Sequence, residues 1–436
     1  MKQILVLGGG AAGMAAAITA AQAAGREAKI TLVEANPKLG KKLLATGNGR
    51  CNLANGDIRP DWYFTGDPPR MQAMLAAIQA GGDPVQWFQT HGLVCRAPDE
   101  AGRIYPYSNQ AADVWGLLGY WLAQSGVEVL CDSKVQDLWM QGSTYTVQLE
   151  DGRRLNGQAV ICALGGKAGP QFGTDGFGSR LAALLGLRTL PEYPCLVPLA
   201  CEKKQVAGLG GIRVKGDVSL YADKTLLRKE SGEVQFTDYG LSGIAVMQLS
   251  GLFHPAEKRV LSIGVDVFPE WETPTLTELL ARRAAQLPGA SMADFMTGLL
   301  HRKVGLAVWH RCDLGPDSRL ASSLRREEWQ QFACALKDWR FTDLTPTSWK
   351  NAQTTGGGVA LDQLIPESFA VKTCPTLYIT GETVDCAGNC GGFNLYWAFG
   401  SGILAGRDAV RRLCGSPDKP HGARPDARRK PRQRKK

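Results

Sequence analysis

The chain has 436 residues, of which 44% are hydrophobic and 21% charged, a composition typical of a globular protein with two or three domains. The formal net charge is +9, but residues 416–436 hold nine Lys or Arg and two Asp, so the rest of the chain is nearly neutral. This distribution argues against nucleic acid as the main partner, and no uninterrupted apolar run of about 18 residues predicts a membrane span.

The twelve cysteines are scattered along the chain, and only five histidines are present. The cysteine pattern is not that of a secreted disulfide framework, which favours a cytoplasmic location. Neither residue type has the spacing of metal ligands, so we predict no metal site. Cys386 and Cys390 form a close pair in a glycine-rich turn. We interpret them as small apolar residues, with a redox-sensing dithiol as the alternative.

The apolar run at residues 4–7 predicts a β-strand that leads through glycines into an Ala-rich helix. Gly8, Gly10 and Gly13 fit the pattern G-x-G-x-x-G, and Ala12 lies within it. The first glycine of this pattern allows a tight turn, the second lets a pyrophosphate approach the backbone, and the third lets helix and strand pack closely. We therefore predict that these four residues bind a dinucleotide at the helix N-terminus.

A second apolar run, residues 29–33, ends in Glu34, about 20 residues after the last glycine, where a carboxylate binds ribose in dinucleotide sites. This carboxylate would repel a 2′-phosphate, so the site favours FAD or NAD over NADP. A secretion signal is the competing interpretation of the N-terminus. It is disfavoured because three consecutive glycines would break the signal helix.

The next loop, residues 37–52, combines glycines with many hydrogen-bonding side chains. Glycine lets the backbone approach a ligand closely, and the polar side chains suit a polar ring system. We predict that the contacts of this loop with a cofactor or substrate come from Thr46, Gly47, Asn48, Arg50 and Asn52.

Apolar spacing predicts two helices between residues 69 and 91, broken near Gly81, and a third helix over residues 111–124. Arg103 and Tyr105 lie between these helices and are further candidates for ligand contact. Apolar or alternating runs predict strands at residues 127–130, 145–149 and 159–164. Gly165 lets the chain leave the last strand near the cofactor.

The pattern changes near residue 190, and residues 191–350 are predicted to form an inserted mixed β/α domain. We expect strands at residues 214–221, 233–237 and 260–268, followed by helices at 276–286, 292–300 and 326–338. Residues 351–415 then complete the cofactor-binding domain begun by residues 1–190. Residues 416–436 are predicted to be a disordered basic tail. The predicted fold is therefore α/β, with a Rossmann-like domain and an insertion.

The closing segment places Gly381 and Glu382 after a strand and a Gly-Gly-x-Asn sequence at a helix start. A carboxylate and a positive helix end suit ribitol hydroxyls and the negative charge of a reduced flavin. At these residues the chain resembles the BaiN-like (YhiN-like) flavoproteins, FAD-dependent oxidoreductases also labelled aminoacetone-oxidase-like. The resemblance rests on the glycine pattern with Glu34 and on residues 41–52, 236–243, 355–359, 381–382 and 391–395.

This resemblance implies a fold of the two-dinucleotide-binding-domain type, in which the N-terminal and C-terminal parts hold FAD and the inserted domain covers it. It supports cofactor contacts from Lys42, Gly381, Glu382, Gly392, Asn394 and Leu395. At least one member is associated with reduction of unsaturated 3-oxo bile acids. We therefore expect a small organic substrate with an activated C=C bond.

Such a reduction needs an electron source, for which we predict NADH or NADPH as a transient co-substrate. It also needs a proton donor, and the candidates are Arg103, Tyr105 and Tyr239. The alternatives are a flavin amine oxidase and a flavin-containing RNA-associated protein that the basic tail recruits. The oligomeric state is left open.

Overall fold

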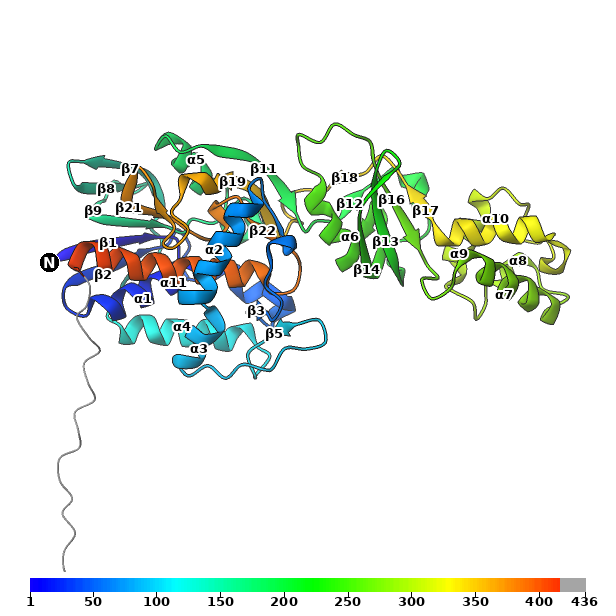
Figure 1. Ribbon diagram of the computed structural model, residues 1–436, viewed down its shortest axis with the longest axis horizontal. Coiled ribbons are helices and arrows are strands. Elements are labelled where there is room, and N and C mark those ends of the chain that lie inside the picture. The colour runs from blue at the N-terminus through cyan, green and yellow to red at the C-terminus, as the bar shows by residue number, and fades with distance from the viewer. Residues whose placement is uncertain (416–436) are drawn as a thin grey trace, which may run out of the picture.

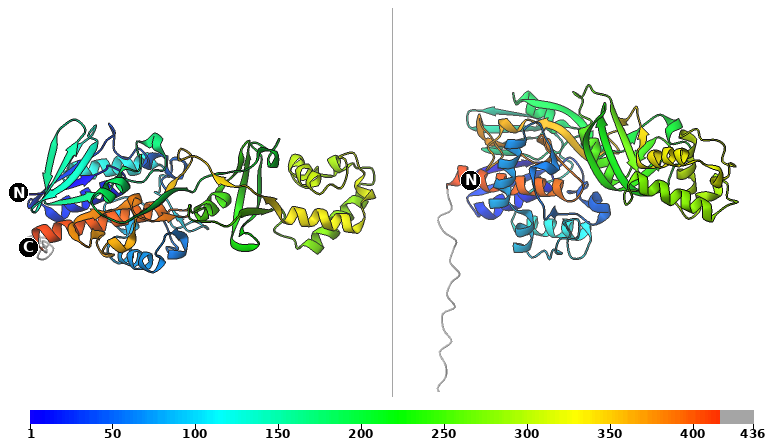
Figure 2. Two further views of the ribbon diagram at one scale, coloured as in Figure 1. Left: turned by 90° about the horizontal axis from the view of Figure 1, so that it is seen from above. Right: turned by 45° about the vertical axis from the view of Figure 1, so that its right-hand side comes forward.

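The computed structural model describes residues 1–415, so the tail predicted at residues 416–436 lies outside the described residues. Figure 1 shows an elongated molecule in which a seven-stranded sheet separates a large α/β part, which contains the N-terminus, from a group of helices at the opposite end. A view at right angles shows the same sequence of parts (Figure 2).

The α/β part is built on a six-stranded sheet with the order β20-β21-β10-β1-β2-β6. Five of its strands are parallel, and β20 pairs antiparallel at the edge. Their apolar runs are buried, as expected where helices cover a parallel sheet. The strands are β1 (Lys2–Leu7), β2 (Ala28–Val33), β6 (Glu128–Leu130), β10 (Ala159–Cys162), β20 (Ala370–Val371) and β21 (Cys374–Ile379).

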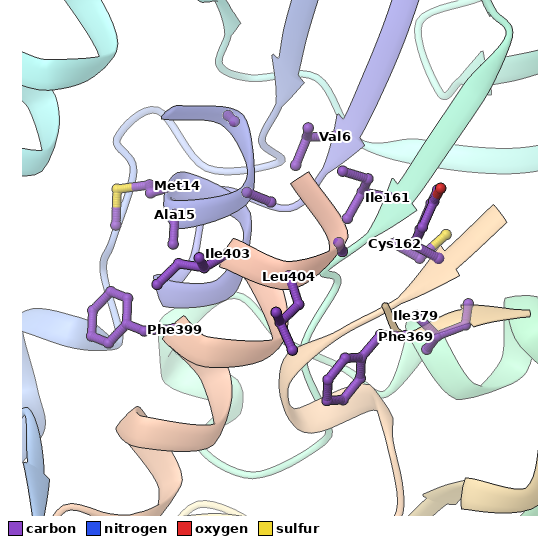
Figure 3. Packing of buried hydrophobic residues seen from close by; sticks show 14 of the residues in the cluster. Val6, Met14, Ala15, Ile161, Cys162, Phe369, Ile379, Phe399, Ile403 and Leu404 are labelled. Carbon is purple, nitrogen blue, oxygen red and sulfur yellow. The ribbon is translucent and has the colours of Figure 1, made fainter. Parts of the chain in front are cut away.

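Two helices from opposite ends of the chain, α1 (Ala11–Ala24) and α11 (Phe393–Cys414), pack together on this sheet. A Cβ atom at Gly402 would lie 2.2 Å from the backbone oxygen of Ala12, so only a glycine permits this approach. Figure 3 shows side chains of both helices beside those of the neighbouring strands in one core. This packing fixes α11 against the glycine-rich end of β1.

The remaining elements of the α/β part surround the sheet. Its helices are α2 (Pro68–Gly81), α3 (Pro84–Thr90), α4 (Ala111–Gln124) and α5 (Phe177–Leu184), and its short 3-10 helices are η1 (Leu43–Gly49), η2 (Pro60–Trp62), η3 (Pro170–Phe172), η7 (Leu361–Gln363) and η8 (Gly381–Thr383). Its further strands are β3 (Ala54–Asn55), β4 (Tyr63–Phe64), β5 (Arg103–Ile104), β7 (Val135–Gln141), β8 (Thr144–Leu149), β9 (Arg154–Gly157), β11 (Thr189–Cys195), β19 (Thr354–Val359) and β22 (Ala387–Gly388).

The chain passes into the second sheet after β11 and returns through β19, which pairs antiparallel with β11. The second sheet is antiparallel, with the order β17-β16-β13-β14-β15-β12-β18. Its strands are β12 (Leu199–Ala200), β13 (Arg213–Ala222), β14 (Thr225–Thr237), β15 (Gly240–Ser242), β16 (Leu261–Asp266), β17 (Trp339–Phe341) and β18 (Thr345–Pro346). We call residues 196–353 the middle domain.

The middle domain also contains helices α6 (Ile244–Leu249), α7 (Thr273–Gln286), α8 (Met292–Phe295), α9 (Arg302–Arg311) and α10 (Arg326–Lys337), with short 3-10 helices η4 (Lys203–Gln205), η5 (Ser250–Leu252) and η6 (Ala321–Ser323). The helix predicted over residues 292–300 is too long. It ends at Phe295 because Gly298 has a φ of +75°, which a continuing right-handed helix does not allow. Helices α6 and α9 were not predicted.

Within residues 1–415, no helix is both long enough and apolar enough to cross a membrane. The same part of the chain contains no group of three or more His, Cys, Asp and Glu side chains placed to hold a metal ion.

Candidate cofactor and substrate site

A cleft of about 860 Å³ opens beside the carboxyl ends of β1, β2 and β10, and part of this space is open to solvent. In open parallel sheets, this edge is where nucleotides bind. The predicted cofactor residues that line the cleft are Gly8, Gly10, Glu34, Lys42, Gly165 and Glu382.

The β1–α1 turn has the geometry that its glycines predict. Gly8 has a φ of +104°, and its amide donates to the carbonyl oxygen of Val33 at 2.8 Å. A Cβ atom at Gly13 would lie 1.8 Å from the backbone oxygen of Gly8, whereas one at Gly10 would meet no atom within 4 Å. The turn therefore needs Gly13 for packing, and Gly10 leaves open space at the start of α1. A phosphate group fits such a helix N-terminus.

The carboxylate of Glu34 is held at the edge of the cleft. Its Oε2 accepts a hydrogen bond from the Gly9 amide at 2.7 Å, and its Oε1 accepts from the Asn36 amide and side chain at 2.8 and 2.7 Å. These three donors fix the carboxylate beside the first glycine turn. An oriented carboxylate at this place is suited to ribose hydroxyls.

Lys42 and Glu382 connect the donor loop to the closing segment of the chain. The Lys42 Nζ atom lies 2.6 Å from Glu382 Oε2 and also donates to the carbonyl oxygen of Ala168 at 3.1 Å. The Glu382 Oε1 atom accepts from the amide and hydroxyl of Thr355 at 3.0 and 2.8 Å. Residues separated by more than 300 positions thus form one wall of the cleft.

The loop around η1 brings several predicted residues together. Gly47 and Asn48 have φ values of +58° and +55°. The Arg50 guanidinium lies 4.8 Å from the centre of the Tyr105 ring, and its Nε donates to Gly47 at 3.1 Å. Asn52 is buried, and its Oδ1 atom has no hydrogen-bond partner among the described residues.

Two predicted catalytic residues, Arg103 and Tyr239, do not contact the residues of the η1 loop. The Arg103 guanidinium donates to the half-exposed Asp99 carboxylate at 2.8 Å in a surface ion pair. Tyr239 lies at the β14–β15 turn of the middle domain and is 39% exposed. Its backbone forms hydrogen bonds with Thr237 and Cys201, both in the same domain.

Thr46, a predicted cofactor residue, donates a hydrogen bond to the Leu43 carbonyl oxygen at 2.7 Å and so stabilises its own loop.

The closing segment contains three glycines with positive φ, among them Gly381 at +66° and Gly392 at +104°. Gly392 is the N-cap of α11. The Asn394 side chain accepts from the Gly388 amide and donates to its carbonyl oxygen, both at 2.7 Å. Asn394 therefore holds the loop before α11 in place. Leu395 is partly buried against the main core.

Four further residues of the α/β part were not predicted as site residues from the sequence. Asn36 and Thr355 hold the two carboxylates of the cleft, and Thr354 and Asn389 each carry a buried oxygen that has no hydrogen-bond partner within residues 1–415. The Thr-Thr pair before the glycine run of β19 and the Asn before Cys390 were the signals available.

These features fit FAD. Gly10 leaves space for a pyrophosphate, and Glu34 is oriented for ribose. We infer that the residues lining the cleft hold the dinucleotide and that the η1 loop and the segment before α11 lie near the flavin. Bound FAD supplies reversible two-electron hydride chemistry, which no amino-acid side chain provides.

All twelve cysteines are free thiols, and the close pair does not have the character of reactive thiolates. Burial raises the pKa of Cys386 well above its usual range, and burial raises the pKa of Cys390 to about 12. Reactive redox cysteines have lowered pKa values instead. The structure therefore favours the interpretation of these residues as small apolar groups.

The fold and the cleft together define a flavin-dependent oxidoreductase of the Rossmann-like class. Comparison with known proteins supports the same class. The family model described as HI0933-like protein Rossmann domain matches residues 2–408. This protein therefore belongs to the HI0933-like family, and it is an FAD-dependent oxidoreductase.

Three known proteins illustrate the range of similarity. A 3-dehydro-bile acid delta(4,6)-reductase from Clostridium scindens is 34% identical over 94% of this chain and 100% of its own length. A ribosomal RNA dihydrouridine synthase from Escherichia coli is 27% identical over 93% of this chain and 97% of its own length. The structure of a 3-ketosteroid delta1-dehydrogenase from Sterolibacterium denitrificans gives a TM-score of 0.48 at 12% identity, covering 94% of this chain and 100% of that one.

Proposed function

We propose that this protein reduces a C=C bond conjugated to a carbonyl group in a small organic molecule, with a 3-oxo steroid acid as the favoured substrate. NADH or NADPH supplies the electrons, and FAD passes them on as hydride. The observation that carries the proposal is the cleft, in which Glu34 is oriented and Gly10 leaves space for a dinucleotide. The similarity to a bile acid reductase over the whole of that enzyme supports the substrate class.

The direct test is product identification. The FAD-loaded protein is incubated with 3-oxochol-4-en-24-oic acid and either NADH or NADPH without oxygen, and the steroid is analysed by mass spectrometry. We expect a product that has gained two hydrogen atoms at the ring double bond. Recovery of unchanged steroid with both nicotinamides, from protein that holds FAD, would refute the proposed substrate class.

Within this function, Asn48, Arg50 and Asn52 are proposed to lie near the flavin, and Tyr105 is proposed as the proton donor. Tyr105 is buried beneath the Arg50 guanidinium, which orients its ring. We expect Tyr105→Phe to lower turnover by about 10²-fold while leaving the FAD content unchanged. A variant that turns over at the wild-type rate would exclude Tyr105 from proton transfer.

A second candidate function is reduction of uracil in RNA. Its support is the Escherichia coli relative, which is named a ribosomal RNA dihydrouridine synthase and matches 93% of this chain. Uracil also contains a C=C bond conjugated to a carbonyl group, so the chemistry is the same. The nine basic residues at positions 416–436 would then attract the RNA backbone.

Truncation separates the two candidates. Deletion of residues 416–436 is expected to leave steroid reduction unchanged if the substrate is a small molecule. If the substrate is RNA, the truncated protein will bind RNA more weakly and with a smaller dependence on salt concentration, because fewer counterions are released.

A further inference from the structure

The dinucleotide cleft has two sides, which follow the two strands that flank β1 in the sheet, β2 and β10. The segment after β2, with Glu34 and Asn36, forms one side together with residues 133–135. The other side consists of residues that follow β10, among them residues 172–177. We call residues 169–176, which lead from the turn after β10 into α5, the strap. A contact between the strap and the segment after β2 therefore bridges the end of β1.

Both ends of the strap are fixed on the β10 side of the cleft. Just before the strap, the Ala168 amide donates to Thr355 Oγ1 at 2.9 Å, and at its end the Gly176 amide donates to the Gly166 carbonyl oxygen at 3.1 Å. Most of the residues between these points are exposed. Burial thus contributes little to holding the middle of the strap, and such a segment opens at a low free-energy cost unless a specific contact holds it.

The Asn36 side chain supplies such a contact. Its Nδ2 atom donates to the Phe172 carbonyl oxygen of the strap at 3.2 Å and to Glu34 Oε1 at 2.7 Å. Gly173, the next residue of the strap, has a φ of +90°, and a Cβ atom there would lie 2.5 Å from Asn36 Oδ1. The strap thus lies directly against the Asn36 amide group. Within residues 1–415, the Asn36–Phe172 bond is the one hydrogen bond that joins the strap to the segment after β2.

The Asn36 side chain matters more to the strap than to Glu34. The Glu34 carboxylate keeps two further donors, the backbone amides of Gly9 and Asn36, at 2.7 and 2.8 Å. Neither bond depends on the side chain at position 36. Removing this side chain therefore leaves Glu34 oriented by two of its three donors, whereas the strap loses its bond across the cleft.

Other hydrogen bonds of the strap do not cross the cleft. The exposed Gln171 side chain donates to the Lys350 carbonyl oxygen at 3.2 Å, in the segment that leads back to β19. The Thr174 hydroxyl donates to the Gly166 carbonyl oxygen, which belongs to the β10 side. Loss of the Asn36 side chain is therefore expected to free the middle of the strap from the β2 side while both ends of the strap stay in place.

We propose that Asn36 is a positioning residue that holds the strap closed over the adenosine half of bound FAD. The same amide group contacts Glu34, the carboxylate placed for ribose, and the strap on the opposite side of the cleft. One side chain thus connects the group that binds the ribose with the segment that covers it. FAD leaves the cleft only after the strap separates from Asn36. This inference concerns the cofactor and goes beyond the proposed reaction, so it does not depend on which substrate is reduced.

A bond that forms only when the strap is closed slows the release of FAD more than its entry. FAD enters while the strap is open and the Asn36–Phe172 bond is absent, whereas release requires this bond to break. For Asn36→Ala, we expect the FAD dissociation rate to rise by about 3- to 10-fold, as for the loss of one hydrogen bond, with no decrease in the association rate. Gly173→Ala, whose methyl group would press on Asn36 Oδ1, is expected to act in the same direction.

The test uses the full FAD-loaded chain, in which bound FAD exchanges for an excess of isotopically labelled FAD and is analysed by mass spectrometry. Because Asn36→Ala and Gly173→Ala break the same contact, the double variant should release FAD more slowly than the product of the two single effects predicts. Asn156→Ala, which loses an exposed bond with Thr146 outside the cleft, is one matched control. Gly92→Ala is the other, at a φ of +92° with no atom within 4 Å of the added methyl group. Both controls are expected to exchange FAD at the wild-type rate.

Hydrogen exchange of backbone amides separates the strap from Glu34. In FAD-saturated Asn36→Ala protein, we expect faster hydrogen exchange across residues 169–176 and unchanged exchange in the β1–α1 turn. If Asn36→Ala does not fold, Gly173→Ala gives the same readouts.

A wild-type rate of FAD release in Asn36→Ala would overturn the inference, and so would single effects that multiply in the double variant. Faster FAD release with wild-type hydrogen exchange in the strap would also overturn it, because Asn36 would then act through Glu34 alone. If the strap opens in the variants as expected but the wild type does not reduce the steroid, the proposed function fails and the inference about Asn36 stands.

Discussion

The glycines of the β1–α1 turn have different physical roles, and single substitutions separate them. A side chain at Gly10 points into open space, so it does not disturb the fold but occupies the place of a pyrophosphate. We expect Gly10→Val to leave the melting temperature of the FAD-free protein nearly unchanged and to weaken FAD binding severely. Fluorescence titration with FAD and calorimetry of the FAD-free protein measure the two effects.

Gly13→Ala is the matched comparison. The added methyl group would lie 1.8 Å from the Gly8 oxygen, so α1 must move away from β1. We expect the FAD-free protein to lose about 1–3 kcal/mol of unfolding free energy, as overpacked sites do. If Gly10→Val destabilises the FAD-free protein as much as Gly13→Ala does, the two glycines do not have the separate roles assigned to them.

The residues of this turn are predictable from the sequence because their geometry is local. Gly8, Gly13 and Glu34 follow from a spacing that a strand, a turn and a helix dictate. Thr355 is not predictable in this way, because it reaches the wall of the cleft through contacts with residues far away in the sequence.

At the scale of elements, the close packing of α1 and α11 determines where the N-terminus of α11 lies. A Cβ atom at Gly406 would be 2.4 Å from the backbone oxygen of Ala16. We expect Gly406→Ala to lower the free energy of unfolding by about 1–3 kcal/mol and to weaken FAD binding, because α11 must shift. Urea unfolding with and without FAD measures both effects.

Gly116 provides the control, since a Cβ atom at this position of α4 would meet no atom within 4 Å. Gly116→Ala is expected to stabilise the protein by about 0.5–1 kcal/mol, because alanine loses less backbone entropy in a helix. A stabilising effect of Gly406→Ala as well would show that the α1–α11 contact is not tight.

A buried carboxylate ties α11 to β21. The Tyr378 hydroxyl donates to Asp408 Oδ2 at 3.0 Å, and Arg411 and Arg412 donate to the same carboxylate. Burial by itself would raise the pKa of Asp408, but the hydrogen bonds from the two arginines and the tyrosine outweigh burial and lower the pKa. The ionised carboxylate is therefore more favourable in the folded than in the unfolded protein.

Because the folded pKa is lowered, this stabilisation is present above the unfolded pKa of about 4 and is lost as the pH falls through the folded value. We expect Asp408→Asn to lower the free energy of unfolding by about 1–3 kcal/mol at pH 7 and by less below about pH 4. Asp151→Asn, which removes an exposed pair with Arg153, should have little effect at either pH. A difference between wild type and Asp408→Asn that does not depend on pH would contradict this assignment.

Local signals were sufficient for some elements and not for others. The break between α2 and α3 and the extent of α4 follow from Gly, Pro and apolar spacing. Helix α9 was missed because its few apolar residues become buried only against the neighbouring helices. The first half of β14 was missed because its charged residues do not alternate with apolar ones, and pairing with β13 holds it in the sheet.

At the scale of the whole molecule, the proposed site uses parts that are far apart in the sequence. Lys42 and Glu382 close the cleft from opposite ends of the chain. The paired strands β11 and β19 carry both crossings between the domains. The sequence predicted the division into a flavin-binding part and an insertion, but it did not predict which edge of the insertion meets the α/β part.

The central claim is that this protein passes electrons from a nicotinamide through FAD to a conjugated C=C bond, and anaerobic stopped-flow absorbance tests it most directly. We expect NADH or NADPH to bleach the flavin band of the FAD-loaded protein, and 3-oxochol-4-en-24-oic acid to restore the band when it is added to the reduced protein. If dithionite bleaches the band but neither nicotinamide does at millimolar concentration, or if the steroid leaves the reduced flavin unchanged, the claim is contradicted.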